Sequence, residues 1–153
     1  MEPPVDSTAT DPKAMAGSSP SSDANPTPMK RANYIAAPHY FNLNIACRVL
    51  TDAFGHNLYL VGSSLLRRDY RDVDVRCILD DSEFDRMFTK ANPTAAHYDP
   101  LWSIMSSSIS LWLSQHSGLP VDFQFQRQTE ANDEHKGMRS AVGIFVNFAD
   151  NTK

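Results

Sequence analysis

The chain has 153 residues, a formal net charge of −4 and a sequence pI of about 5.6. This length suits one domain with a hydrophobic core, and the acidic balance argues against a protein that coats nucleic acid through its overall field. No apolar run approaches the roughly 18 residues of a membrane span and no signal peptide is visible, so we expect a cytoplasmic protein.

Residues 1–33 differ in composition from the rest of the chain. They hold six of the ten prolines, are otherwise mostly Ser, Thr, Ala and Asp, and contain no aromatic residue. Such a segment cannot bury enough apolar area to offset its ordering entropy, so we expect a disordered tail followed by one domain over residues 34–153. A natural start at Met15 or Met29 is a further hypothesis, which mass spectrometry of the native protein would test.

The first half of the domain is predicted to hold a helix and two strands. Apolar residues recur at helical spacing over residues 38–54, and Gly55 stands where a helix would end. Residues 57–62 form a short apolar run, and charged and apolar residues alternate at the start of 72–79. Both patterns are typical of strands.

The second half is predicted to hold two helices, a strand, a polar loop and a last strand. We place these at residues 83–91, 99–118, 120–126, 127–140 and 141–148. Ser82 suits the N-cap of the first helix. In the second helix one face can hold Leu101, Ile104, Met105, Ser108, Leu111 and Trp112. Trp102 and Trp112 of this helix are expected to lie in the core. The order predicts an α/β (α+β) domain, a small mixed sheet flanked by helices.

Two carboxylates share one face of the strand predicted at residues 72–79. Side chains two apart on a strand point the same way, so Asp72 and Asp74 lie together with Arg76 after them. Carboxylates this close repel one another, and without a cation one has a raised pKa or both stay solvated. Bound Mg²⁺ removes the conflict, because it prefers carboxylate oxygens.

Asp122 has the same surroundings, a carboxylate between apolar residues at the start of a strand. If its strand lies beside residues 72–79 with the polar faces matched, Asp72, Asp74 and Asp122 converge. Three carboxylates can hold two divalent ions, an arrangement suited to in-line attack on phosphorus. Asp122 is also a candidate general base toward the attacking hydroxyl.

The apolar run at residues 57–62 ends in Gly62, Ser63 and Ser64, which form a candidate phosphate-binding turn. Glycine permits close backbone approach, and the N–H groups and hydroxyls that follow suit phosphate oxygens. Arg67 is a candidate triphosphate contact, with Arg68 and Arg71 nearby. Taken singly, each motif is more often an ordinary turn, strand end or solvated loop.

The joint pattern resembles the nucleotidyltransferase superfamily, with its DNA polymerase beta-like fold. The resemblance rests on Val61-Gly62-Ser63, Asp72-Val73-Asp74-Val75 and Val121-Asp122-Phe123, and it is closest to the minimal, single-domain members. It implies that the three aspartates bind metal and that the turn holds a nucleoside triphosphate. The eight-residue spacer Ser64 to Arg71 is shorter than is usual in the family and lacks its second glycine.

From this resemblance we expect a transferase that moves a nucleoside monophosphate from a nucleoside triphosphate such as ATP to an acceptor hydroxyl, with two Mg²⁺ or Mn²⁺ ions. The acceptor stays open between an RNA end, a protein and a small molecule. One alternative is a non-catalytic or antitoxin-like binding protein of the same fold. Another is a two-metal phosphohydrolase.

The remaining chemically reactive residues carry weaker signals. The five histidines show no metal-ligand spacing, although His135, Lys136 and Arg139 could approach the site from the polar loop. Cys47 and Cys77 fall on predicted core faces and are expected to be buried, reduced thiols.

Overall fold

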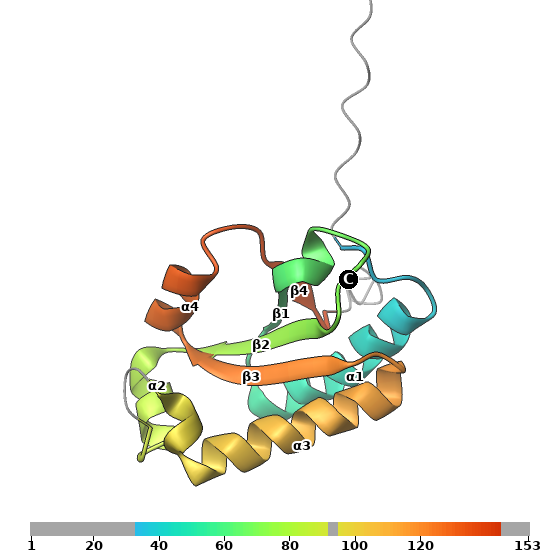
Figure 1. Cartoon of the computed structure of the whole chain (residues 1–153). Coiled ribbons are helices and arrows are strands. Elements are labelled where there is room, and N and C mark those ends of the chain that lie inside the picture. Colours follow the sequence, from blue (N-terminus) through green and yellow to red (C-terminus); the bar gives the residue numbers. More distant parts are fainter. Residues whose placement is uncertain (1–32, 92–94, 145–153) are drawn as a thin grey trace, which may run out of the picture. The chain divides into compact units, whose positions relative to one another are not determined.

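A mixed four-stranded sheet forms the centre of the domain (Figure 1). The computed structural model describes residues 33–91 and 95–144; the tail expected over residues 1–33, with Met15 and Met29, lies outside them apart from Asn33. The strands are β1 (Leu58–Val61), β2 (Val73–Leu79), β3 (Val121–Arg127) and β4 (Ser140–Val142). Their order is β3-β2-β1-β4; β1 runs antiparallel to β2 and β4, and β2 runs parallel to β3. The mixed α/β architecture is as predicted.

Helices cover both faces of this sheet. The helical elements are α1 (His39–Phe54), the 3₁₀ turn η1 (Gly62–Leu65), α2 (Asp81–Met87), the 3₁₀ turn η2 (Ala96–Tyr98), α3 (Pro100–Ser117) and α4 (Gln128–Glu134). Figure 1 shows α1 and α3 on one face, with α4 and η1 over the other. No helix in the described part of the chain has the length and apolar character needed to cross a membrane.

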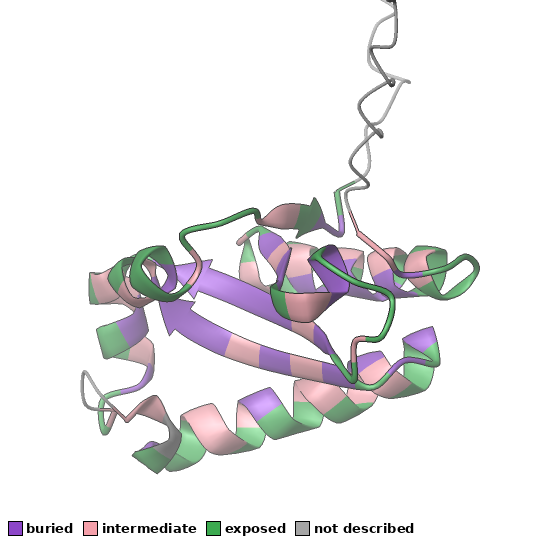
Figure 2. Cartoon of the chain, turned by 45° about the horizontal axis from the view of Figure 1, so that its top comes forward, coloured by how far each residue is buried: buried purple, intermediate pink, exposed green. Residues whose placement is uncertain are grey.

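The hydrophobic core lies between the sheet and the pair α1 and α3. Alternate residues of β2 enter it, and the central strands are buried along most of their length (Figure 2). These inward residues are Val73, Val75, Cys77 and Leu79, which confirms the predicted alternation. Cys47 and Cys77 are both free and buried, again as predicted.

The predicted bounds of α3 are confirmed, and Trp102 and Trp112 pack against the core as predicted, but the face predicted for the apolar residues is only partly buried. Asp99 caps the helix through the N–H groups of Leu101 and Trp102. Leu101, Ile104 and Leu111 of that face are 47%, 64% and 61% exposed. The packed residues are Trp102, Met105, Ile109, Trp112 and Leu113.

Serines of α3 contribute to this orientation, because they bind the backbone of β3. Ser110 Oγ accepts a hydrogen bond from the N–H of Phe123 at 2.8 Å, and Ser114 Oγ accepts one from the N–H of Val121 at 3.0 Å. β3 is an edge strand, whose outer N–H groups would otherwise lack partners in the sheet. These bonds add to the packing of the apolar residues of α3 in holding this side of the helix inward.

Three other boundaries differ from the prediction. Helix α2 begins at Asp81 rather than after Ser82, and it ends at Met87. The polar segment predicted as a loop contains α4, in which Thr129 donates to Asp81 from its N–H at 3.0 Å and its hydroxyl at 2.6 Å. The last strand is shorter than predicted, and residues 145–148 of that prediction lie outside the described residues.

Candidate active site

Asp74 and Asp122 lie side by side on the parallel strands β2 and β3. They are direct partners in the register of the two strands, so the condition stated for their convergence, matched polar faces on neighbouring strands, is met. Their neighbours Val73, Val75 and Phe123 enter the core, so both carboxylates lie on the opposite sheet face, where each is half-buried. Two aspartates far apart in sequence are thereby brought together.

Arg76 bridges this pair. Its Nη2 donates to Asp74 Oδ1 and to Asp122 Oδ2, each at 3.1 Å. Its Nη1 donates to the carbonyl oxygens of Val75 at 3.1 Å and Asp122 at 2.9 Å. The side chain is only 8% exposed, and its Nε has no hydrogen-bond partner within the described residues. Sequence reasoning placed Arg76 on this face but missed its role.

The electrostatics of Asp74 reflect opposing influences. Burial raises the pKa of its carboxyl group, Arg76 lowers it, and the negative charges of Asp72 and Asp122 raise it. The net shift is upward, so the buried arginine only partly offsets the cost of holding charge here. A further cation near Asp74 would favour its ionised form.

Asp72 is not brought into the pair in the same way. It is exposed and precedes β2, whose pairing with β3 begins at Val73 and Val121. The strand ladder therefore does not fix its position, although its charge acts on Asp74. Within residues 33–91 and 95–144, no three His, Cys, Asp or Glu side chains are grouped to hold a metal ion.

The predicted phosphate turn packs directly against Asp74. Gly62 has a left-handed backbone with φ of 75°, and a Cβ at this position would collide with Asp74 Oδ2. Ser63 is half-buried at the start of η1, whereas Ser64 is fully buried and its hydroxyl has no partner within the described residues. Arg67 is exposed, 3.6 Å from Asp69. Ser63 and Arg67 can therefore meet a ligand, while the Ser64 hydroxyl cannot.

A cavity of about 210 Å³ opens beside this turn. Its lining comes from η1 with the residue after it, and from the end of α4 with the segment that follows. It comprises Gly62, Leu65, Leu66, Glu134, His135, Gly137 and Met138. Two of these lining residues are held by the buried Gln126, whose Nε2 donates to Glu134 Oε2 at 2.7 Å and whose Oε1 lies 3.1 Å from His135 Nε2. Burial and the positive charge of Arg76 lower the pKa of His135.

The other two residues expected to approach from this segment have different surroundings. Lys136 is exposed and lies 3.2 Å from Asp133. Arg139 donates to the carbonyl oxygen of Ala131 at 2.6 Å and so ties the end of α4 to the chain leading into β4. Of the three, His135 shares a cavity with the phosphate turn.

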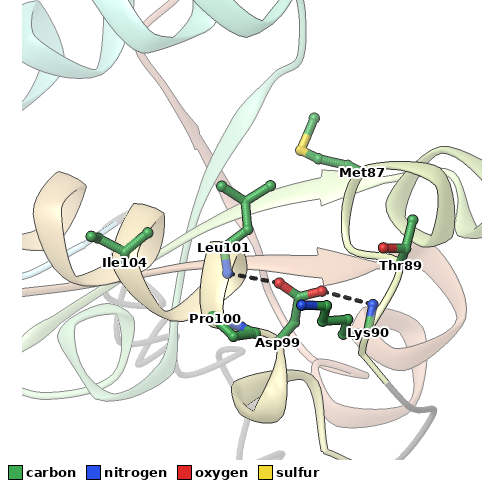
Figure 3. Close-up of a pocket in the computed structure, with 7 residues that line it drawn as sticks. All are labelled: Met87, Thr89, Lys90, Asp99, Pro100, Leu101 and Ile104. Atoms are coloured by element: carbon green, nitrogen blue, oxygen red, sulfur yellow. Dashed lines mark hydrogen bonds between the residues drawn. The ribbon is translucent and has the colours of Figure 1, made fainter.

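A larger cavity of about 420 Å³ lies between the end of α2 and the start of α3 (Figure 3). Its one carboxylate, Asp99, accepts hydrogen bonds from the N–H groups of Lys90 and Leu101, both at 2.8 Å. These bonds cap α3 and tie it to the chain after α2. Asp74 lies near the start of β2, whereas α2 follows the end of that strand. This cavity is therefore separate from the paired aspartates.

No known protein family matches the chain, and neither the curated proteins nor the solved structures provide a match. What the protein does must therefore be inferred from its residues and their geometry.

Proposed function

We propose that the protein transfers a nucleoside monophosphate from a nucleoside triphosphate to an acceptor hydroxyl and releases pyrophosphate. The observation that carries this proposal is the pairing of Asp74 with Asp122 directly beside the Gly62 turn. Carboxylates suited to a divalent ion thus adjoin a glycine turn suited to phosphate. The buried thiols of Cys47 and Cys77 fit a reducing compartment such as the cytoplasm.

The donor atoms suit Mg²⁺ or Mn²⁺ because they are all carboxylate oxygens. Asp74 and Asp122 would hold the metal, and Asp72 lies close enough for its charge to act on Asp74. When bound, the divalent ions supply positive charge that activates the attacking hydroxyl and stabilises the leaving pyrophosphate.

The chain's own groups supply binding and proton transfer. Ser63, with the backbone N–H groups after Gly62, would hold the triphosphate, and the exposed Arg67 would contact its outer oxygens. Asp122 would accept the proton of the acceptor hydroxyl. Ser64 would contribute through its backbone, because its side chain is buried.

The test is nucleotide transfer by the purified protein. Each α-³²P-labelled nucleoside triphosphate is mixed with Mg²⁺ or Mn²⁺, the protein and a cell extract, and mass spectrometry identifies the labelled acceptor. We expect transfer by the wild type, loss in Asp74→Ala, and full activity in Asp52→Asn. Asp52 is an exposed aspartate on α1, whose helix packs on the opposite sheet face. If Asp74→Ala still transfers nucleotide, the assignment of Asp74 to the active site is wrong.

A second candidate is a binding protein of the same fold without catalysis. It is favoured by Arg76, which already bridges Asp74 and Asp122 and could hold them permanently without metal. Calorimetry with ATP and Mg²⁺ separates the two candidates, since metal-dependent nucleotide binding is expected only of the enzyme. Release of orthophosphate in place of pyrophosphate would instead indicate a phosphohydrolase.

A further inference from the structure

We infer that the outer face of helices α1 and α3 binds a second copy of this chain. The outer face is the side of the two helices that points away from the sheet and its core. Asp74 and Asp122 lie on the opposite side of the sheet, so this contact leaves them open to solvent. The inference therefore does not depend on the proposed function.

Large apolar side chains line this outer face. On α1 they recur every four residues, and on α3 they lie away from the buried Ser106 and Leu113. Each is between 47% and 64% exposed: Phe41, Ile45 and Val49 on α1, and Leu101, Ile104 and Leu111 on α3. The face that a surface helix turns to water usually carries charged and polar residues. A group of exposed apolar residues in that position is typical of a surface that binds a partner.

The two rows belong to one side of the domain, because α1 and α3 pack side by side over the same sheet face (Figure 1). His39 Nδ1 lies 2.9 Å from the carbonyl oxygen of Ser117, which joins the start of α1 to the end of α3. At the start of α3, Leu101 and Ile104 also line the cavity of about 420 Å³ (Figure 3). The face therefore includes a hollow that an apolar side chain of a partner can enter.

The charges of the two helices restrict the kind of partner. Helix α3 contains no Asp, Glu, Lys or Arg, and α1 contains only Arg48 and Asp52, which pair with each other at 2.9 Å. Nucleic acids and anionic membranes bind clusters of Lys and Arg, so this face does not attract them. The chain carries a net charge of −4, yet two copies that meet through this face bring no excess of like charge together.

The size of the face also suits a second copy. Helices α1 and α3 have 16 and 18 residues. The face is therefore about 25 Å long, and a pair of packed helices is about 20 Å wide. Two such faces bury about 1,000 Å² together, which is the lower end of the range for specific interfaces. An apolar face without net charge is complementary to its own copy, as a two-fold dimer requires. We therefore expect a weak dimer that forms at micromolar concentrations.

The experiment measures the mass of the full chain by analytical ultracentrifugation between about 1 and 200 µM. We expect the wild type to change from one chain to two over this range, also in about 1 M NaCl, because salt screens charges but does not weaken apolar contacts. Ile45→Asp and Leu111→Asp place a charge on each helix and should raise the dissociation constant about 10-fold or more. Leu66→Asp is the matched control, since Leu66 is 67% exposed next to η1 on the other side of the sheet, and it should dimerise like the wild type.

A wild type that stays monomeric at the highest concentration would overturn the inference. Unchanged dimerisation of Ile45→Asp and Leu111→Asp would also overturn it, because the two copies would then meet through another surface. The same holds if Leu66→Asp loses dimerisation equally. Circular dichroism establishes that each variant is folded, and Ile45→Ser, which removes apolar area without adding charge, replaces an aspartate variant that is not. The nucleotide-transfer assay tests the proposed function separately, so either proposal can fail while the other stands.

Discussion

Gly62 lies so close to the carboxylate of Asp74 that a side chain at position 62 would displace it. The contact joins the end of β1 to β2, its antiparallel neighbour, in which Asp74 pairs with Val61. The glycine is therefore needed for two reasons, its left-handed backbone and the approach of a carboxylate oxygen.

Gly62→Ala is predicted to lower the free energy of unfolding more than Gly55→Ala. Both glycines have φ near 70°, at 75° and 71°, but a Cβ at Gly55 meets nothing within 4 Å. The backbone strain alone costs about 1–2 kcal/mol in each variant. Urea unfolding should show a further loss of unfolding free energy in Gly62→Ala only, because only there is Asp74 displaced. Equal losses in the two variants would mean that the contact is readily relieved.

The sheet face of the two aspartates was predictable from the sequence. Each stands between inward-facing residues near the start of a strand, and period-two alternation then fixes its face. The register that places Asp74 opposite Asp122 was only a condition in the sequence analysis, because a slip of two residues would keep the same faces toward the core. The contribution of Asp72 was harder to predict, because β2 begins one residue after it.

Ser110→Ala is predicted to destabilise the domain by about 1–3 kcal/mol, because it leaves the N–H of Phe123 on the edge strand without its partner. Ser107→Ala serves as the control. Ser107 is exposed on the same helix, and alanine there should leave stability unchanged or slightly raise it through helix propensity. Chemical denaturation of both variants measures the difference, and equal stabilities would show that the serine bond contributes nothing.

Other features escaped prediction because they depend on contacts between distant segments. Helix α4 buries only Ala131, so it lacks an apolar stripe, and its start is bound by Asp81 from α2. The inward face of α3 combines apolar residues at helical spacing with serines that bind the β3 backbone, and the serine bonds could not be predicted from the helix alone. The role of Arg76 likewise depends on β3 lying beside β2.

Cys47 and Cys77 are predicted not to react with Ellman's reagent in the folded protein. Burial raises the pKa of each thiol to about 12, so almost no reactive thiolate is present at neutral pH. Ellman's reagent should detect no thiol in the native protein and both in denaturant. Rapid reaction of either thiol without denaturant would contradict the described burial.

Asp99 is predicted to make stability depend on acid pH. Burial of this carboxyl raises its pKa, but the N–H groups of Trp102, Lys90 and Leu101 outweigh that effect and hold the pKa below its usual value of 3.8. The stabilisation from these bonds is therefore fully present above the pKa that Asp99 has in the unfolded chain. It is lost as the pH falls below that value toward the lower pKa of Asp99 in the folded protein. Urea unfolding between pH 3 and 7 should show a smaller decline for Asp99→Asn than for the wild type. If the free energies of unfolding of the wild type and of Asp99→Asn fall equally with pH, Asp99 is not the source of the pH dependence.

The most direct test of the central claim is a double-mutant cycle on Asp74 and Asp122, with pyrophosphate release as the readout. If the two carboxylates act as one unit, Asp74→Asn and Asp122→Asn should each reduce kcat/KM by about 100-fold or more, and the double variant should be little worse than either. If either single variant keeps near-wild-type kcat/KM, or if the two reductions in kcat/KM multiply in the double variant, the two carboxylates do not act as one unit and the central claim is wrong.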